Sequence, residues 1–410
     1  VEAGRKGGRA SAGRLSFVAM IYFDHNATAP LRPEAKAAML RAMEIGGNPS
    51  SVHAAGRAAR AMVEDAREQV AAFAGAKPGD VIFTSGGTEA NALVLRGAVA
   101  GALDAEDRIT RLFVVATAHD SALSVARDLA EKTPGLVLTI IPVTEHGRID
   151  PKVFRSLLMN GKGRVLVSLI FANNETGVIE DIAAMAAVLR AEGGEGALLH
   201  VDAVSAGYSP VRFSAWGADY LSLASHKIGG PQGAGALIAR EVAPLSPLFN
   251  GVQEMRRRAG TQNVIGVVGF GAAARALQAN FDAESEHVGV LRTYFEESLR
   301  NMEPNAVVFG THEVRQKNLS CFAIPQLQAE STLMALDLDG ICVSSGAACS
   351  SGKVSPSHVL EAMNVDESLA RCALRASFGP EHGVTEIDAL IHSLSRWMGR
   401  KLALAAAGGA

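Results

Sequence analysis

The chain has 410 residues, a length that corresponds to two or three domains at roughly 150 residues per domain. Hydrophobic residues make up 48% and charged residues 20%, which is typical of a globular protein and excludes a disordered, highly charged tail protein. The 39 basic and 42 acidic side chains give a net charge of −3, so no cationic excess indicates nucleic acid as a partner. No stretch approaches the ~18 uninterrupted apolar residues of a membrane helix. We therefore expect a cytoplasmic protein with no nucleic-acid and no membrane partner.

Residues 1–19 differ in composition from the rest of the chain. They are rich in Gly, Arg and Ser and have neither a helical nor a strand period. A secretory signal or an organellar transit peptide is an alternative, because basic residues precede the apolar run at 17–23. That run is short and ends at Asp24 without a small-residue cleavage site. We interpret residues 1–19 as a disordered extension, with the natural beginning at Met20.

The next part of the chain alternates between helical and strand patterns. From Arg57 the spacing of Met62, Ala66, Val70 and Phe73 predicts a helix that ends at Gly75. Apolar, β-branched runs at 81–84, 112–116, 137–142, 165–171, 198–201 and 220–223 predict strands, and helical patterns such as 89–100 and 182–191 lie between several of them. Nearly continuous apolar strands separated by helices indicate an α/β fold, with a large domain whose mostly parallel sheet is flanked by helices.

The pattern changes from about Asn280 onward. A helix at 288–301 precedes strand-like runs at 306–309, 320–323 and 341–343, and another helix and a closing one near 387–402 follow. We interpret this part as a smaller α+β domain. The expected organisation is a large domain over 33–275 and a small domain made of 20–32 and 276–410.

Ligands of an open α/β sheet bind where strands end and helices begin, and four such junctions carry polar residues. At 85–88 a Gly-rich turn opens a helix, whose backbone N–H groups and the Thr88 hydroxyl could hold a phosphate. A capping turn with Ser85 or Thr88 as N-cap is the alternative. His119 follows a second strand, and a lone histidine there is more often structural.

Asp202 and Lys227 occupy the other two junctions. Asp202 ends an apolar strand, where a carboxylate is costly to bury unless a positive group pairs with it. The alternative to a site that holds such a group is that Asp202 is a helix N-cap. Lys227 lies between an apolar strand and a turn with three glycines, where a fixed amine can act as a Schiff-base nucleophile once its pKa is lowered; a solvated charge is the alternative. Together with the phosphate turn and His119, these residues indicate pyridoxal phosphate, with Asp202 keeping the pyridine nitrogen protonated.

The chain resembles the NifS/IscS-like cysteine desulfurases, which are class V, fold-type I pyridoxal-phosphate enzymes. The motifs that carry the resemblance are residues 22–28 (YFDHNAT), 47–53 (GNPSSVH), 84–91 (TSGGTEAN), 173–177 (NNETG), Asp202, His226-Lys227, 259–261 (AGT), 344–352 (SSGAACSSG) and 374–379 (LRASFG). The resemblance covers almost everything after Met20, and the loop at 344–352 indicates the long-loop group. It implies a fold-type I transferase whose large domain binds the cofactor and whose small domain carries the cysteine loop.

The resemblance also implies roles for individual residues. Lys227 would hold the cofactor and move the substrate Cα proton, Asp202 would pair with the pyridinium nitrogen, and His119 would stack on the ring and act in acid–base steps. The phosphate would be held by Gly87, Thr88 and His226. In a homodimer, Thr261 would contact the phosphate of the partner subunit. The cofactor O3′ region and the amino-acid carboxylate would be met by Asn174 and Arg375. Arginine suits a carboxylate because its fork binds both oxygens.

Two positions depart from the family pattern. Ser205 stands where the family usually has Gln, and it is too short to replace that side chain. Ala224 stands where the family usually has a phosphate-binding Ser, and we expect Ser225 to supply the hydroxyl instead.

Cys349 carries the chemistry that separates a desulfurase from its relatives. None of the four cysteines forms a C-x-x-C pair, and we expect Cys321, Cys342 and Cys372 to be small buried hydrophobes. The Ser, Gly and Ala neighbours of Cys349 indicate a mobile loop and an accessible thiol. The resemblance implies that the Cys349 thiolate takes the sulfur of L-cysteine as a persulfide, releases alanine, and passes the sulfur to an acceptor or iron–sulfur scaffold protein. No structural metal site is expected. The one metal contact that the resemblance suggests is that of Cys349 with a nascent iron–sulfur cluster.

Three other functions stay open at this point. A selenocysteine lyase would use nearly the same residues, and a class V aminotransferase or C–S lyase would share the cofactor residues without needing the Cys349 loop. A non-catalytic sulfur-carrier scaffold is suggested by Ser205 and Ala224, although Lys227 and Asp202 argue against it. Iron–sulfur assembly, nitrogenase maturation and tRNA thiolation are all open as destinations of the sulfur.

Overall fold

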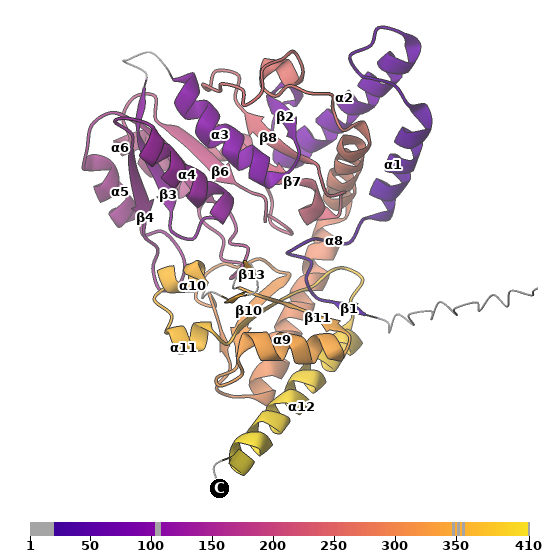
Figure 1. The fold of residues 1–410 in the computed structure, drawn as a ribbon, viewed down its shortest axis with the longest axis vertical. Helices are drawn as coiled ribbons and strands as arrows, with labels where there is room; N and C mark the ends of the chain where they lie inside the picture. Colours follow the sequence, from indigo (N-terminus) through magenta and orange to yellow (C-terminus); the bar gives the residue numbers. More distant parts are fainter. Residues whose placement is uncertain (1–19, 103–107, 347–348, 351–352, 355–356, 409–410) are drawn as a thin grey trace, which may run out of the picture.

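The structure is a computed structural model that describes residues 20–102, 108–346, 349–350, 353–354 and 357–408. The expected extension at 1–19 lies outside the described residues. The chain folds into two lobes, with a large sheet in one and a small sheet in the other, and the long helix α8 (Val264–Met302) runs from one into the other (Figure 1).

A seven-stranded sheet forms the centre of the larger lobe, in the order β2-β8-β7-β6-β5-β3-β4. Its strands are β2 (Val81–Thr84), β3 (Ile109–Val115), β4 (Val137–Ile141), β5 (Arg164–Ile170), β6 (Leu198–Asp202), β7 (Tyr220–Ala224) and β8 (Gly235–Ala239). β3 to β7 pair with one another in parallel, whereas β8 is antiparallel to both β2 and β7. The predicted, mostly parallel sheet is confirmed, and β8 is an additional strand that the sequence pattern did not reveal.

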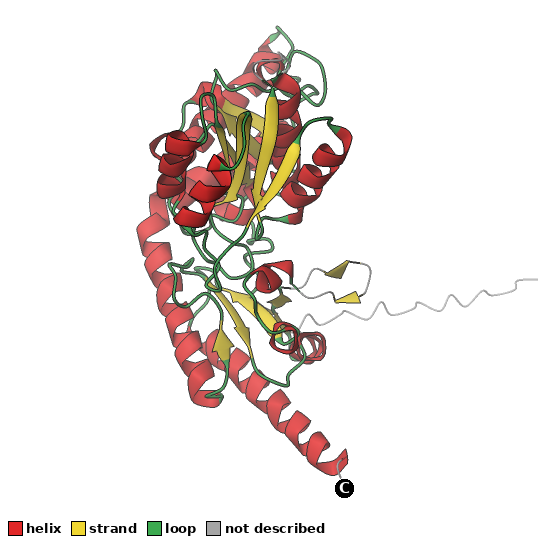
Figure 2. Cartoon of the chain, turned by 90° about the vertical axis from the view of Figure 1, so that its left-hand side faces the viewer, coloured by secondary structure: helices red, strands yellow, loops and turns green. Residues whose placement is uncertain are grey.

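Helices cover both faces of this sheet (Figure 2). They are α1 (Pro33–Ile45), α2 (Ala54–Ala74), α3 (Gly87–Gly101), α4 (Asp120–Lys132), α5 (Pro151–Met159), α6 (Ile182–Glu192) and α7 (Phe213–Trp216), with short 3₁₀ turns η1 (Pro78–Asp80), η2 (Ser225–Ile228) and η3 (Glu254–Arg256). The predicted end of α2 is confirmed, because Gly75 adopts φ 66° and its N–H bonds the carbonyls of Ala71 and Ala72.

The smaller lobe is built on a four-stranded antiparallel sheet in the order β12-β15-β10-β9. Its elements are β9 (Val307–Val308), β10 (Leu319–Ala323), α9 (Ala329–Leu338), β11 (Ile341–Cys342), β12 (Ser344–Ser345), α10 (His358–Ala362), α11 (Glu367–Ala370), β15 (Ala373–Ser377) and α12 (Val384–Gly408). β1 (Ile21–Tyr22) pairs with β11 in parallel, so the N-terminal segment joins the C-terminal part of the chain. The expected boundary at 275/276 falls within α8 and stays a prediction.

Among the described residues, α8 is the one helix long and apolar enough to cross a membrane by length and composition alone. The most apolar 18-residue stretch of α8 is 56% buried, and the helix packs against α1, α2 and α12. This burial is what the core helix of a folded protein shows.

The segment around Cys349 contains a short β-ladder. The backbone of β13 (Cys349–Ser350) pairs with that of β14 (Lys353–Val354) in an antiparallel arrangement, and the expected mobility of the loop and accessibility of its thiol stay predictions. Cys321 and Cys372 are buried as expected. Cys342 is only half-buried, and the expectation is wrong there because the two-stranded β1–β11 sheet leaves the residue partly open to solvent.

Candidate active site

A cavity of about 200 Å³ lies at the carboxyl ends of the large-sheet strands. Its lining residues are Gly87, Thr88, Asn91, His119, Ser121, Ile170, Asn174, Asp202, Val204, Ser205, His226 and Lys227. Every residue predicted to bind the cofactor lines this cavity except Ser225 and Thr261. Residues from five separate chain segments therefore meet at one edge of the sheet, which is where open α/β sheets bind ligands.

The start of α3 forms one end of the cavity. α3 follows Gly86, which makes no side-chain cap, so neither Ser85 nor Thr88 is the N-cap. A Cβ on Gly87 would lie 2.4 Å from Val204 Cγ2, and a Cβ on Gly235 would lie 2.6 Å from Gly86 Cα. The close packing requires glycine at both places and leaves the first N–H groups of a 15-residue helix directed at the cavity, an arrangement that suits a phosphate.

Asp202 ends β6 inside the cavity and is only 4% exposed. Asn91 Nδ2 donates to its Oδ2 at 2.7 Å, and the backbone N–H of Val204 donates to its Oδ1 at 3.0 Å. Both donors are neutral, so a cationic ligand group such as a pyridinium could pair with this buried carboxylate. Asn91 was missed by the sequence reasoning, although it lies in the motif at 84–91 and one helical turn after Gly87.

Lys227 follows β7 in η2 and reaches the same cavity. Its Nζ donates to the Asn26 carbonyl at 2.6 Å. Burial lowers the pKa of Lys227 to about 8; the Arg375 charge acts in the same direction, while Asp24 and Asp202 oppose it. A much larger fraction of this amine than of an ordinary lysine is therefore neutral and nucleophilic near neutral pH.

His226 lies beside the amine and is held by the N-terminal segment. Its Nδ1 lies 3.1 Å from Thr28 Oγ1. Burial, and then the charge of Lys227, lower the pKa of His226 to about 4, so the ring is neutral at physiological pH. A neutral imidazole can take part in a hydrogen bond to a phosphate oxygen through a ring N–H.

A hydrogen-bond chain connects His119 to Asp202. The backbone N–H of Ser121 donates to His119 Nδ1 at 3.1 Å, so a neutral His119 ring carries its hydrogen on Nε2. Ser121 Oγ accepts from Asn91 Nδ2 at 2.9 Å, and the same amide nitrogen donates to Asp202. The orientation of the histidine and the placement of the carboxylate are therefore coupled through Asn91.

Asn174 and Arg375 meet where the two lobes join. The Asn174 carbonyl accepts hydrogen bonds from Arg375 Nη1 at 2.8 Å and from Asn26 Nδ2 at 2.7 Å. Arg375 lies on β15 of the small sheet, is 6% exposed, and stands outside the cavity lining. The small lobe thus supplies a buried cation at the rim of a site built by the large lobe.

Ser225 and Thr261 are not brought to the cavity. Ser225 is fully buried, and its hydroxyl points at Gly230, where an added Cβ would lie 2.2 Å from Oγ. Its hydroxyl is buried without a hydrogen-bond partner among the described residues, so its contact with the phosphate stays a prediction. Thr261 is exposed between η3 and α8, and its contact with a partner subunit stays a prediction. Ser205 does line the cavity, as the short replacement for the usual Gln.

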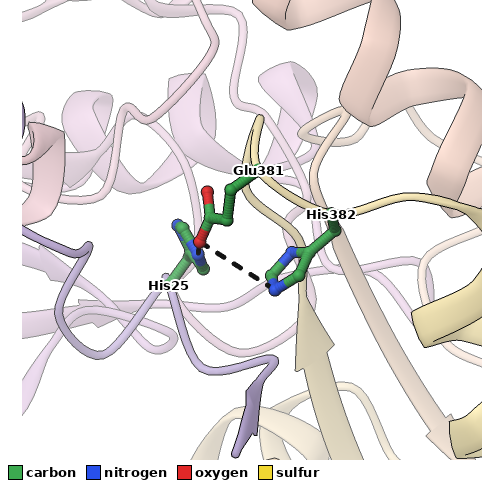
Figure 3. A group of neighbouring side chains, drawn as sticks. All are labelled: His25, Glu381 and His382. Atoms are coloured by element: carbon green, nitrogen blue, oxygen red, sulfur yellow. Dashed lines mark hydrogen bonds and ion pairs between the residues drawn. The ribbon is translucent and has the colours of Figure 1, made fainter. Parts of the chain in front are cut away.

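His25, Glu381 and His382 form a cluster close to the site (Figure 3). Among the described residues they are the one group of His, Cys, Asp and Glu side chains close enough to share a metal ion, with ligand atoms within 4.8 Å of one another. His25 Nε2 lies 2.7 Å from Glu381 Oε1, and His382 Nε2 lies 3.9 Å from the same oxygen. The Gly379 N–H donates to His382 Nδ1 at 2.9 Å, so a neutral His382 carries hydrogen on Nε2 and offers no lone pair there. We interpret the cluster as a hydrogen-bonded bridge between the N-terminal segment and the turn after β15.

Comparisons with known proteins agree with this geometry. The class-V aminotransferase family matches residues 21–390. A cysteine desulfurase of Cereibacter sphaeroides is 40% identical over 380 residues, which cover 91% of this chain and 94% of that protein. Cysteine desulfurase IscS of Dictyoglomus turgidum is 38% identical over 362 residues, which cover 88% of this chain and 89% of that protein.

Solved structures give the same result. A NifS-like protein from Rickettsia africae superposes with a TM-score of 0.82 at 32% identity, covering 92% of this chain and 99% of that one. Another NifS-like protein superposes with a TM-score of 0.85 at 28% identity, covering 93% and 99%. The chain therefore belongs to the class-V aminotransferase family and, within it, to the NifS/IscS-like cysteine desulfurases, a pyridoxal-phosphate-dependent group with the fold-type I architecture.

Proposed function

We propose that this protein is a pyridoxal-phosphate-dependent cysteine desulfurase that takes the sulfur of L-cysteine onto Cys349 and releases L-alanine. The observation that carries the proposal is one cavity that holds the amine of Lys227, the carboxylate of Asp202 and the N-terminus of α3. An amine of lowered pKa, a buried carboxylate and a phosphate cradle are the three groups that the aldehyde, ring nitrogen and phosphate of this cofactor require.

The cavity residues fit the cofactor group by group. Gly87, Thr88 and His226 would hold the phosphate, and Asp202 would hold the protonated ring nitrogen. Lys227 would bind the aldehyde carbon, and Asn174 would lie near the ring oxygen. When bound, pyridoxal phosphate supplies an electron sink for the bonds at the Cα of an amino acid.

The chain's own groups would manage the protons and the substrate carboxylate. The amine of Lys227, whose pKa burial lowers to about 8 in the cofactor-free protein, would take the Cα proton of L-cysteine in its neutral form. His119, with hydrogen on Nε2, would donate a hydrogen bond at the ring face. Arg375 would bind the substrate carboxylate through charge-assisted hydrogen bonds.

Cys349 would then act as the nucleophile. Its thiolate attacks the substrate sulfur, so that an S–S bond forms while the Cβ–S bond breaks. The electron pair of the broken bond stays with the carbon skeleton, which takes up a proton and leaves as alanine. The persulfide on Cys349 then passes to an acceptor or iron–sulfur scaffold protein.

The proposed enzyme works as a cytoplasmic homodimer. Thr261 supports this part of the proposal, because it is exposed and lies near the exposed Arg256, a cation that suits an anionic ligand of a second subunit. Sedimentation at working concentration tests the assembly, and an active monomer would contradict it.

The deciding experiment compares Cys349→Ala with the wild-type enzyme. The variant is expected to keep the cofactor, its colour and the spectral shift on adding L-cysteine, because Lys227 and Asp202 are unchanged. It is expected to lose alanine production almost completely, because no thiolate is present to take the sulfur. Near wild-type release of alanine by this variant would show that sulfide leaves directly, as in a C–S lyase.

Mass spectrometry supplies an independent measurement. Wild-type enzyme treated with L-cysteine and then alkylated is expected to carry about 32 Da of additional mass, one sulfur atom, on the peptide that contains Cys349. Cys321→Ala and Cys372→Ala are the control variants, because both thiols are buried and their loss is expected to cost stability but not the transfer. Selenocysteine offered in parallel with L-cysteine measures which of the two substrates the site prefers.

A further inference from the structure

Glu175 is a buried carboxylate in the turn that carries Asn174, and it has no role in the proposed chemistry. It is 6% exposed, and its backbone N–H donates to Asn173 Oδ1 at 2.9 Å. Asn173 Nδ2 in turn donates to the Thr117 carbonyl at 3.1 Å. The turn is therefore fixed to the strand end that precedes His119, and Glu175 extends from it toward the small lobe.

One oxygen of Glu175 contacts both ends of the segment that contains Cys349. Ser357 Oγ donates to Glu175 Oε2. On the other side, a Cβ built on Gly346 would lie 2.6 Å from the same oxygen, so the Gly346 backbone packs directly on the carboxylate. Gly346 precedes Cys349 by three residues (349 − 346 = 3), and Ser357 follows it by eight (357 − 349 = 8).

Ser357, on the C-terminal side of the Cys349 segment, is also held against the large lobe. Ser357 is the N-cap of α10, where its Oγ accepts from the Leu360 N–H at 3.2 Å. The next residue, His358, places Nε2 3.0 Å from the Ala118 carbonyl, directly before His119. The base of the Cys349 segment is thus connected to the turns that carry Asn174 and His119.

The hydrogen bond from Ser357 needs only an acceptor oxygen, so it can form with either charge state of Glu175. Burial raises the pKa of Glu175, while Ser357, His358 and Arg375 act in the opposite direction. Removing the carboxyl group would leave the Ser357 hydroxyl without its acceptor and open a space beneath Gly346, whereas a glutamine would keep both the acceptor and the volume.

We propose that Glu175 is a positioning residue that holds both ends of the Cys349 segment beside Asn174 and His119, and so sets the approach of the thiol to the substrate sulfur. The inference rests on the proposed function, because it assigns a step to Cys349. Glu175 is not among the residues that line the cofactor cavity, so the main effect of its loss is expected at the sulfur-transfer step.

The test compares Glu175→Ala and Glu175→Gln with a matched control, Glu180→Gln. Glu180 is also buried, and its carboxylate accepts from Ile149 and Asp181 backbone N–H groups, away from the Cys349 segment. Three experiments use loaded enzyme: the cofactor spectrum is recorded with and without L-cysteine, kcat and KM are measured for alanine release, and the rate at which iodoacetamide alkylates Cys349 is determined.

Glu175→Ala is expected to keep the spectral shift and the KM while kcat falls about 10- to 100-fold, the range expected for a misplaced reacting group. The alkylation rate of Cys349 is expected to change several-fold. Glu175→Gln is expected to recover most of the wild-type kcat and alkylation rate. Glu180→Gln is expected to leave kcat and the alkylation rate at their wild-type values.

Wild-type kcat and alkylation rate in Glu175→Ala would overturn the proposal, and so would equal losses in the Glu175 and Glu180 variants. Failure of the proposed function is seen separately, as alanine release by Cys349→Ala. The alkylation rate does not depend on turnover, so it still reports whether Glu175 positions the segment.

Discussion

Arg375 Nη2 lies 2.7 Å from Asp24 Oδ1, and this ion pair joins β15 of the small sheet to the N-terminal segment beside Lys227. The side chains are 7% and 20% exposed, so water screens the pair only in part. Nη1 is occupied by the Asn174 carbonyl, whereas the buried Nε has no hydrogen-bond partner among the described residues. The guanidinium is therefore fixed in direction, and its Nε–H is among the donors that remain for a ligand carboxylate.

The first prediction concerns this arginine. Arg375→Lys is expected to lower kcat/KM for L-cysteine by about 10- to 100-fold, mainly through KM, because an ammonium cannot reproduce the fork that holds Asp24, Asn174 and a carboxylate together. Steady-state alanine release measures the effect, and the cofactor absorbance is expected to stay. Arg371→Lys is the matched control, since Arg371 forms an exposed pair with Glu367 on α11. An unchanged KM in Arg375→Lys would show that another group binds the substrate carboxylate.

The second prediction concerns the pKa of Lys227. In cofactor-free protein, competitive labelling with an amine-reactive reagent is expected to give a midpoint near pH 8 for Lys227, well below the ordinary 10.5, because burial disfavours the ammonium form. Asp24→Asn is expected to lower the midpoint further, since the Asp24 charge stabilises the ammonium. A midpoint near 10.5 would mean that the amine is solvated in the free protein.

Much of the fold could be predicted from the sequence because apolar periodicity is a local signal. β3, β5, β6 and β7 are buried almost throughout, and their continuous apolar runs identify them directly. The strand-end positions of His119, Asp202 and Lys227 follow from the same pattern, since the parallel strands bring them to one edge.

Other features depend on contacts that no local pattern records. β8 is a Gly- and Ala-containing segment that becomes a strand because β2 and β7 pair with it on both sides. Asn91 looks like an ordinary helical residue until β6 places Asp202 against it. The Ser225 side chain lies in the η2 turn against Gly230, a contact that the local sequence does not predict.

The third prediction concerns His200, which is fully buried on β6 below Asp202. Its Nδ1 lies 2.9 Å from Ser168 Oγ and its Nε2 3.0 Å from Ser222 Oγ. Burial lowers its pKa from 6.5 to about 3, so between these values the unfolded chain binds a proton that the folded protein does not. The free energy of unfolding is therefore expected to fall with acidification by about 1.4 kcal/mol per pH unit from this site alone.

Urea unfolding between pH 7.5 and 4.5 measures this slope in the wild type and in His200→Gln, which cannot titrate. The free energy of unfolding of the variant is expected to fall less steeply below pH 6.5. Its slope against pH should be smaller by the equivalent of up to one bound proton. Identical slopes would mean that His200 becomes protonated without unfolding.

The fourth prediction concerns the buried pair Arg67–Glu254, which holds η3 against the sheet. Arg67 Nη1 and Nη2 lie 2.8 and 3.0 Å from the Glu254 carboxylate, and the Phe83 N–H donates to it at 2.9 Å. Glu254, Met255 and Arg256 all have positive φ, at 44°, 56° and 66°, so the carboxylate contacts must hold a turn that its own residue types disfavour.

Glu254→Ala is expected to cost about 3–5 kcal/mol of unfolding free energy, because it leaves the Arg67 charge buried without its main partner. Glu64→Ala is the matched control: Glu64 pairs with the same guanidinium at 3.0 Å, but its side chain is 54% exposed, so its loss is expected to cost less than about 1 kcal/mol. Urea unfolding at pH 7 measures both values. An equal loss of unfolding free energy in the two variants would show that water reaches Arg67 and that other contacts hold the positive-φ backbone of η3.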